Sequence, residues 1–191
     1  MSRRQSATAL EVKTPVDVLL AEHALHRRML AVFERIARVV ESGAAFPSND
    51  VASVLGYLRE FVELVHQRRE SRTIYPLVME LADDRIAEEV GQLLADHDQT
   101  QELLQSLWLF WEPGPLRSDE VAVFVRFAKT YIERLRRHMV VEELSLFPAV
   151  LVVDDQRRAE IAAELERKEP GLSDLASWSS VVAELEERWI A

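Results

Sequence analysis

The sequence contains no cysteine among its 191 residues. Disulfides, thiolate metal sites and cysteine nucleophiles are therefore excluded, which leaves histidine and carboxylate as the strong metal ligands. Long hydrophobic runs are also missing, since the longest apolar stretch, around residues 144–153, is interrupted by Ser145 and Pro148 and is too short to cross a bilayer. No apolar run follows Arg3 and Arg4, so we expect a cytoplasmic protein without a secretory signal or a membrane partner.

Turn-forming residues are scarce, with 5 glycines and 7 prolines. In a chain rich in leucine, alanine, valine, glutamate and arginine, this scarcity predicts long helices joined by short connections. Apolar residues make up 48% and charged residues 29%, the balance of a globular protein. The net charge of −10 argues against nucleic acid as a partner, because phosphate binding needs a cationic face.

Helical periodicity, punctuated by capping residues and prolines, predicts four long helices. They are expected from Thr14 (N-cap) and Pro15 to Gly43, from residues 48–50 to Pro76, from residues 83–84 to the Pro-Gly-Pro at 113–115, and from residues 118–119 to Pro148. No stretch alternates as a β-strand does. Long amphipathic helices with short links predict an all-α, antiparallel up-down-up-down four-helix bundle.

The chain is expected to divide into three parts. Residues 1–13 form a flexible N-terminus, residues 14–152 the bundle, and residues 153–191 a C-terminal helical extension. In the extension we expect a helix from Asp154 to about Lys168, a break at Pro170-Gly171 and a final segment capped by Ser173. This segment either packs on the bundle or serves a homo-oligomer interface, and the sequence leaves both open.

The chain repeats itself at positions that carry histidine. Residues 19–23 read Leu-Leu-Ala-Glu-His and residues 93–97 read Leu-Leu-Ala-Asp-His. A His-x-x-x-Glu motif, followed by an aromatic residue and proline, occurs at residues 66–76 and again at 138–148. The offsets between the paired histidines are 97 − 23 = 74 and 138 − 66 = 72 residues. Two helix pairs of nearly equal length are therefore expected to face each other across a pseudo-two-fold axis.

Four of the five histidines occupy these repeated positions. Residues four apart on a helix share one face, so each His-x-x-x-Glu motif presents an imidazole and a carboxylate together. In a bundle core such groups converge on metal. Four imidazoles and two carboxylates are too many for one tetrahedral zinc and suit two ions, with two histidines each and both carboxylates bridging. The candidate ligands are His23, His66, Glu70, His97, His138 and Glu142.

Charge balance agrees with a pair of bridged ions at this site, as iron illustrates. Two ferrous ions with two glutamates carry 4 − 2 = +2, and two ferric ions with two glutamates and one oxide carry 6 − 2 − 2 = +2. If an oxide enters when the two irons are oxidised, the buried charge is the same in both oxidation states. This avoids the cost of uncompensated charge in a dry core. We expect two iron ions in an oxo- or hydroxo-bridged centre, with manganese or zinc occupancy left open.

These motifs resemble the hemerythrin HHE cation-binding family, and the resemblance covers roughly residues 15–152. It implies an antiparallel four-helix bundle with a di-iron site on the same six residues. The sequence departs from the oxygen-carrying hemerythrins, because Gln101 stands where they have a further histidine and the fourth helix carries His-x-x-x-Glu in place of His-x-x-x-x-Asp. The pattern of His, His-x-x-x-Glu, His and His-x-x-x-Glu is that of the bacterial HHE-type proteins.

Residues beside the motifs receive simpler interpretations. Glu22, Asp96 and Glu143 are candidates to orient the imidazoles by accepting a hydrogen bond from the ring nitrogen that does not bind metal. The alternative for each is a solvated position. His26 is explained by an ordinary helix pair with Glu22, and Tyr75 by core packing next to its proline. The flanking arginines are interpreted as solvated: Arg68, Arg69, Arg136 and Arg137.

The leading functional hypothesis is a non-haem di-iron protein that binds or processes dioxygen, peroxide or nitric oxide, in stress defence or in sensing of oxygen or iron. As an enzyme it would decompose peroxide in a catalase-like way or act as another oxidoreductase. The alternative is a metal-free helical bundle that serves as an interaction module. Ferritin-like carboxylate bundles need Glu-x-x-His on two helices, and Leu135 stands where the second glutamate would be.

Overall fold

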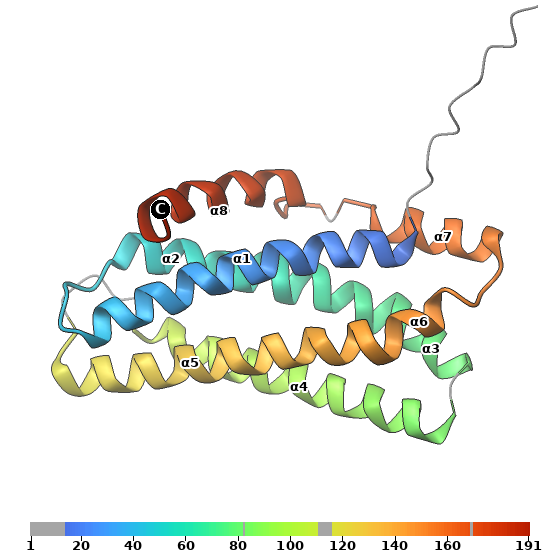
Figure 1. The fold of residues 1–191 in the computed structure, drawn as a ribbon, viewed down its shortest axis with the longest axis horizontal. Helices are drawn as coiled ribbons and strands as arrows, with labels where there is room; N and C mark the ends of the chain where they lie inside the picture. The colour runs from blue at the N-terminus through green and yellow to red at the C-terminus, as the bar shows by residue number, and fades with distance from the viewer. Residues whose placement is uncertain (1–13, 82, 111–115, 169) are drawn as a thin grey trace, which may run out of the picture.

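The computed structural model describes residues 14–81, 83–110, 116–168 and 170–191, so the predicted flexible segment 1–13 lies outside the described residues. Four long helical stretches run side by side, and no residue within these ranges is in a β-strand (Figure 1). The stretches are α1 (Pro15–Glu41), α2 (Ser48–Tyr57) continuing to α3 (Tyr75–Leu81), α4 (Asp84–Trp108), and α5 (Ser118–Val141) continuing to α6 (Phe147–Val150). The predicted all-α four-helix bundle is confirmed.

Two of the helices begin as their sequences predict. Before α1, the Asp17 backbone N–H donates to the Thr14 hydroxyl at 3.1 Å and the Asp17 carboxylate accepts from the Thr14 N–H at 2.8 Å. Pro15 occupies the first helical position, where its missing N–H costs nothing. Before α4, Asp83 accepts from the Ile86 N–H at 3.0 Å. These bonds satisfy N–H groups that a helix leaves free at its start.

Two other predicted caps are displaced by one residue. The residue before α5 is Arg117, whose backbone N–H donates to the Glu120 carboxylate at 2.8 Å. The residue before α8 (Leu175–Trp189) is Asp174 rather than Ser173, and Asp174 accepts from the Ser177 N–H at 3.0 Å. A carboxylate is available at each start, so the choice between neighbouring caps depends on the backbone path.

The helices that we expected to end near Pro76 and Pro148 continue through both prolines, because the backbone widens into π-helical turns before them. The π-helical segments are η1 (Leu58–Gln67), η2 (Glu70–Ile74) and η3 (Glu142–Leu146). The Tyr75 N–H donates to the Glu70 carbonyl, and the Phe147 N–H donates to the Glu142 carbonyl. In an α-helix a proline ring clashes with the carbonyl four residues earlier, and a wider turn relieves that clash. The two wide turns that directly precede the prolines, η2 and η3, each begin at the glutamate of a His-x-x-x-Glu motif.

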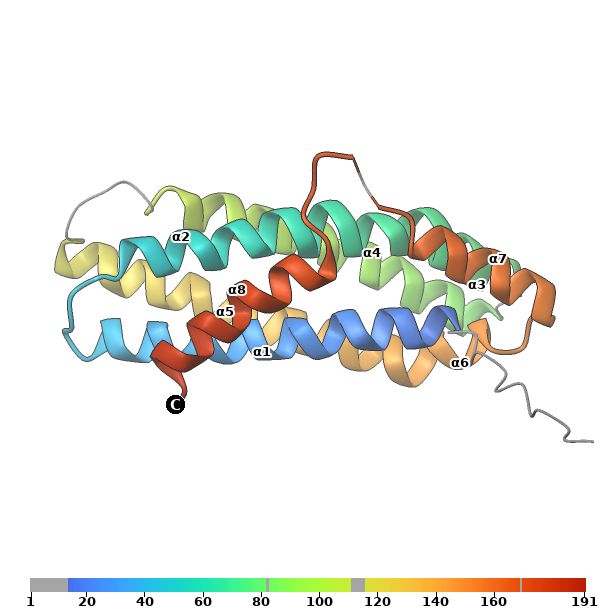
Figure 2. The same cartoon turned by 90° about the horizontal axis from the view of Figure 1, so that it is seen from above.

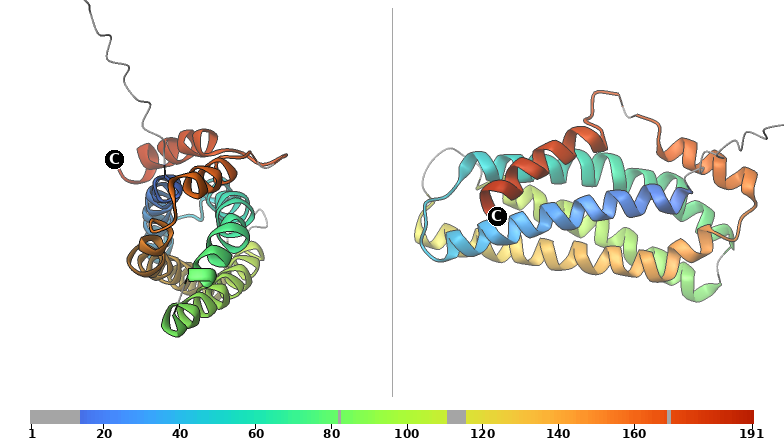
Figure 3. Two further views of the ribbon diagram at one scale, coloured as in Figure 1. Left: turned by 90° about the vertical axis from the view of Figure 1, so that its right-hand side faces the viewer. Right: turned by 45° about the horizontal axis from the view of Figure 1, so that its top comes forward.

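The C-terminal extension lies on the outside of the bundle. It consists of α7 (Asp155–Leu165), which ends before the predicted Lys168, and α8; both contact α1, as Figures 2 and 3 show. Trp178, Val182 and Leu185 of α8 are buried, and the Trp178 ring lies 5.4 Å from the Tyr57 ring on α2. The final segment therefore packs on its own bundle, which was one of the two arrangements left open.

The core consists of two apolar clusters with a layer of buried polar side chains between them. On α1, His23 lies between Leu19 of one cluster and Leu25 of the other. The larger cluster contains Phe33 and Phe124, and the other extends to α3, α6 and α7. Across the described ranges no helix combines the length and apolarity needed to span a membrane. The apolar clusters shield the polar layer at both ends.

Candidate metal centre

All four long stretches of the bundle contribute side chains to the buried polar layer. α1 supplies His23, η1 supplies His66, α4 supplies His97 and α5 supplies His138, while Glu70 and Glu142 open η2 and η3. All six side chains are buried. The structure therefore brings together every residue that the sequence proposed as a ligand.

The six residues form two groups that share both glutamates: His23, His66, Glu70 and Glu142, and Glu70, His97, His138 and Glu142. In each group, one donor atom per residue lies within 4.8 Å of the others. The two Nε2 atoms of each histidine pair are 3.1 Å apart. Two nitrogens at adjacent corners of an octahedron, with metal bonds of about 2.1 Å, would be about 3.0 Å apart. Each histidine pair therefore has the spacing of two ligands of one ion.

The glutamates face both histidine pairs. Glu70 Oε1 lies 3.0 Å from His66 Nε2, and its other oxygen lies 3.5 Å from His97 Nε2. Glu142 Oε2 lies 3.4 Å from the Nε2 atoms of both His23 and His138. Both Glu70 oxygens and Glu142 Oε2 are buried without a hydrogen-bond partner among the residues described. Buried carboxylate oxygens without a donor are costly, and cations between them would remove that cost.

The buried acids and imidazoles shift one another's pKa values. Burial would raise the pKa of Glu70, yet the imidazoles around it, His66 foremost, hold it well below its usual range. Burial would lower the pKa of His138, but Glu142 and Asp96 raise it to about 10. Without metal, protons on the imidazoles therefore compensate the carboxylates. Metal ions would take over that role, so metal binding and proton release are coupled.

Carboxylates hold the outer nitrogens of the first histidine pair. Glu22 Oε2 lies 2.7 Å from His66 Nδ1, and Glu143 Oε1 lies 2.8 Å from His23 Nδ1. A carboxylate that accepts the Nδ1 proton fixes the ring orientation and leaves Nε2 free for a metal. Glu22 is buried, so the solvated alternative for this residue is wrong.

Two arginines extend this support outwards. Arg27 Nη2 donates to both oxygens of Glu143, at 2.7 and 2.8 Å. Arg69 donates to Glu22 at 2.7 Å and, through its second terminal nitrogen, to the backbone carbonyl of Arg167 at 2.8 Å. The interpretation of Arg69 as solvated is wrong, because its side chain is only 13% exposed. The C-terminal extension is thus tied to the support of the first histidine pair.

The second histidine pair is supported less closely. Ser71 Oγ lies 3.4 Å from His97 Nδ1, and Asp96 Oδ2 lies 3.9 Å from His138 Nδ1, which is beyond hydrogen-bond range. His138 Nδ1 is buried without a hydrogen-bond partner within the described ranges, while Arg134 binds Asp96 at 2.5 Å. The two pairs thus differ in how firmly their rings are held.

Tyr75 is buried in the apolar cluster that contains Phe147, as the sequence predicts, and its hydroxyl also contacts the candidate ligands. Its hydroxyl donates to Glu142 Oε1 at 2.7 Å and lies 3.2 Å from His97 Nε2. The phenol ring stacks on the His97 ring at 5.5 Å. At the equivalent position the apolar Phe147 packs 5.4 Å from His23. The signal in the sequence was this exchange of tyrosine for phenylalanine in the repeat.

The predicted pair between His26 and Glu22 is also wrong. His26 Nδ1 lies 2.5 Å from the Tyr57 hydroxyl, and the His26 ring is fully buried beside His66. Glu22 directs its oxygens to the second helix instead. Burial lowers the pKa of His26 well below its usual value, and the neighbouring imidazoles add to that shift. His26 is therefore a neutral neighbour of the candidate ligands.

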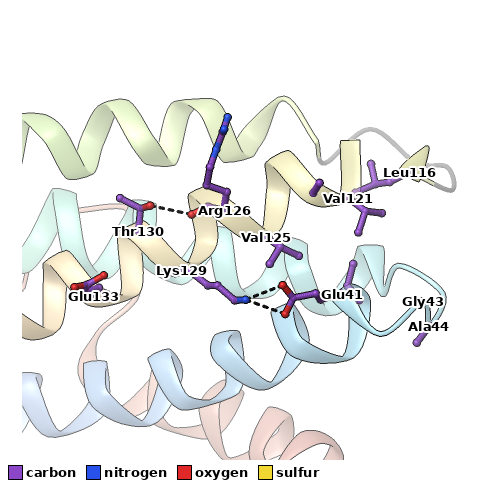
Figure 4. A pocket seen from close by; sticks show the side chains of 12 residues that line it. Glu41, Gly43, Ala44, Leu116, Val121, Val125, Arg126, Lys129, Thr130 and Glu133 are labelled. Carbon is purple, nitrogen blue, oxygen red and sulfur yellow. Dashed lines mark hydrogen bonds and ion pairs between the residues drawn. The ribbon is translucent and has the colours of Figure 1, made fainter. Parts of the chain in front are cut away.

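One sizeable cavity lies away from this layer. It has a volume of about 700 Å³ and is formed by the C-terminal end of α1 and the N-terminal half of α5 (Figure 4). Lys129 donates to both oxygens of Glu41 at 2.8 Å beside it. Glu41 follows His23 by 41 − 23 = 18 residues, or about 27 Å of helix. The cavity contains none of the six candidate ligands.

A four-helix bundle with two buried groups of histidine and glutamate defines a metal-binding protein of the hemerythrin type. Residues 14–150 match the Hemerythrin HHE cation binding domain, which is 150 − 14 + 1 = 137 of 191 residues. The chain therefore belongs to the hemerythrin HHE cation-binding family. Comparisons with curated proteins and with solved structures gave no match.

Proposed function

We propose that the chain is a non-haem di-iron protein that binds or processes dioxygen, peroxide or nitric oxide. The observation that carries this proposal is the pair of buried four-residue groups that share both glutamates. One ion would be held by His23 and His66, the other by His97 and His138, and the two glutamates would bridge them. Imidazole with carboxylate is a ligand set that suits iron, with manganese and zinc as the competing ions.

The unpaired carboxylate oxygens favour a metal centre over a metal-free structural bundle. Both oxygens of Glu70 are buried, lack a hydrogen-bond partner in the described part of the chain, and face different histidine pairs. A purely structural bundle would have to offset these carboxylates with protons on the neighbouring imidazoles, which leaves charges buried on both partners. Two cations would satisfy the same oxygens.

Bound iron would supply one-electron redox chemistry and an open coordination position for a small ligand. The chain's own residues would hold and shield the centre. Glu22 and Glu143 fix the rings of one histidine pair, and the Tyr75 hydroxyl holds one oxygen of Glu142. The apolar clusters on either side exclude water from the layer.

Metal analysis and an absorption spectrum of protein expressed with added iron test the proposal. We expect about two irons per chain, as in other two-metal sites, and near-ultraviolet iron bands that are lost in His66→Ala. His26→Gln is the matched control, because His26 is equally buried but lies outside both groups, and it should keep both irons. A folded wild-type protein that takes up no transition metal would leave the interaction module as the better reading.

Peroxide consumption by the iron-loaded protein then separates an enzyme from a binding protein. Steady turnover would assign a catalase-like activity. Stoichiometric binding of dioxygen or nitric oxide without turnover would assign sensing or storage.

A further inference from the structure

The internal repeat lets the surroundings of one histidine pair be compared with those of the other. Adding 74 to a position on α1 gives its counterpart on α4, so Arg27 corresponds to Gln101. Adding 72 on the second stretch gives the counterpart on the fourth, so Ser71 corresponds to Glu143 and Gln67 to Met139. Around His23 the three positions carry two charged side chains and one apolar one, Arg27, Glu143 and Met139. Around His97 the same positions carry uncharged polar side chains, Gln101, Ser71 and Gln67.

The path to His23 is closed. Arg27 and Glu143 form a two-bond ion pair across it, and Glu143 also contacts His23 Nδ1 at 2.8 Å. Met139 is completely buried at the position that corresponds to Gln67. The side chain of His23 has no exposed surface.

The equivalent path to His97 is open. Gln67, Ser71 and Gln101 line a pocket of about 360 Å³, which His97 also lines and which extends to the exposed Arg68 and Asp98. The side chain of His97 is 10% exposed, against 1% or less for the other three candidate histidines. Among the six candidate ligands, His97 alone lines this pocket.

The walls of this pocket suit a small polar molecule. The amides and the hydroxyl can donate and accept hydrogen bonds, and the ion pair of Arg59 with Glu63, at 2.5 Å, balances charge at the rim. Among the described residues, the outer nitrogen of His97 has only the Ser71 hydroxyl nearby, at 3.4 Å, so no carboxylate closes this side of the ring as Glu143 closes that of His23.

We propose that small polar ligands, of the size of peroxide or azide, reach the centre through the pocket of Gln67, Ser71 and Gln101. They arrive at the His97–His138 half. This inference rests on the proposed di-iron function and adds to it the route and the half at which a ligand arrives.

Stopped-flow absorbance with azide as the probe tests the route in iron-loaded protein. Gln101→Trp fills the pocket from α4, and Ser71→Leu fills it beside the His97 ring. Each should slow azide association by about tenfold or more at unchanged iron content, because a blocked route lowers the association rate. The control is Gln105→Trp, an exposed residue one turn further along α4 that does not line the pocket, and its rate should stay within about twofold of wild type.

Unchanged azide rates in both Gln101→Trp and Ser71→Leu, with iron retained, would overturn the route but not the di-iron centre. A wild-type protein without iron would overturn both. The crystal structure of the azide complex gives a second readout. Azide on the ion held by His97 and His138 supports the proposal, and azide on the ion held by His23 and His66 contradicts it.

Discussion

In the His23–His66 half of the candidate centre, carboxylates contact both outer imidazole nitrogens, at 2.8 and 2.7 Å. In the other half the corresponding distances are 3.4 Å to Ser71 and 3.9 Å to Asp96. The exchange of glutamate for aspartate shortens the side chain by one methylene, and the exchange for serine removes the carboxylate. A repeated fold can therefore present two equal sets of inner ligands while the residues behind them make the two positions chemically unequal.

The largest expected effect is the loss of metal when a glutamate shared by the two halves is removed. Glu70→Ala removes the carboxylate that faces both histidine pairs, so both metal ions should be lost. In the proposed two-ion centre, His97→Ala removes a candidate ligand of one pair only and should leave about one metal ion per chain. Metal analysis after gel filtration measures both, with Glu60→Ala on the same helical stretch as the control. Two metal ions retained in Glu70→Ala would contradict the shared role.

The next-largest expected effect is a loss of metal affinity. It compares the carboxylates that lie behind the histidines in the two halves. Glu22→Ala removes a direct contact with His66, and loss of such a support weakens metal binding by about 10- to 100-fold. Asp96→Ala removes a group at 3.9 Å from His138, so the loss should be only a few-fold. Competition with a chelator measures both affinities. Equal losses in the two variants would show that the difference in distance has no consequence for the metal.

That the six candidate ligands come together could be predicted, because the motifs that carry them are visible in the sequence. Helix spacing places His66 with Glu70, and His138 with Glu142, on one face, and the repeat adds His23 and His97. The antiparallel bundle follows from four long helices with short links, and the structure confirms it. The family match over residues 14–150 agrees with the resemblance that these motifs carry.

The backbone irregularity could not be predicted in the same way. In a regular α-helix, a residue five positions after another is turned by about 140° to a different face. The π-helical turn from Glu70 brings Tyr75 back towards the site, where its hydroxyl reaches Glu142. The repeat pairs Tyr75 with Phe147 beside a proline, so the sequence predicts core packing for Tyr75 but not the contact of its hydroxyl with Glu142. The aspartate at position 96 was visible, but its distance from His138 depends on how α4 and α5 pack.

A smaller effect concerns the position where the repeat has exchanged phenylalanine for tyrosine. Tyr75→Phe makes this one position the same in both halves and leaves Glu142 Oε1 without its donor. Hydrogen bonds to charged groups contribute about 1.5–3 kcal/mol, so the free energy of unfolding of the metal-free protein should fall by about 2 kcal/mol. Urea unfolding followed by circular dichroism measures it. Tyr57→Phe removes a hydroxyl that contacts neutral His26 and should cost about 1 kcal/mol, so an equal or larger loss there would contradict the argument.

The smallest expected effect is the contribution of Asp96 to the change of stability with pH in the metal-free protein. The pKa of His138 is raised from 6.5 to about 10, so its contribution to stability is fully present below pH 6.5 and is lost as the pH rises towards 10. The pKa of Glu70 is lowered from 4.5, so its contribution is present above pH 4.5 and is lost in acid. The urea midpoint of the metal-free protein should therefore fall between pH 6.5 and about 9.

Asp96→Asn tests whether the weaker support still acts through charge. Asp96 is one of the groups that raise the pKa of His138, so its neutralisation should lower that pKa and flatten the fall of the midpoint. The iron-loaded protein is the control, because metal in place of the protons removes the titration from this range. A midpoint that falls equally steeply in wild type and Asp96→Asn would show that a carboxylate at 3.9 Å does not influence His138. The two halves would then differ in charge as well as in distance, because only Glu22 and Glu143 would act on their imidazoles.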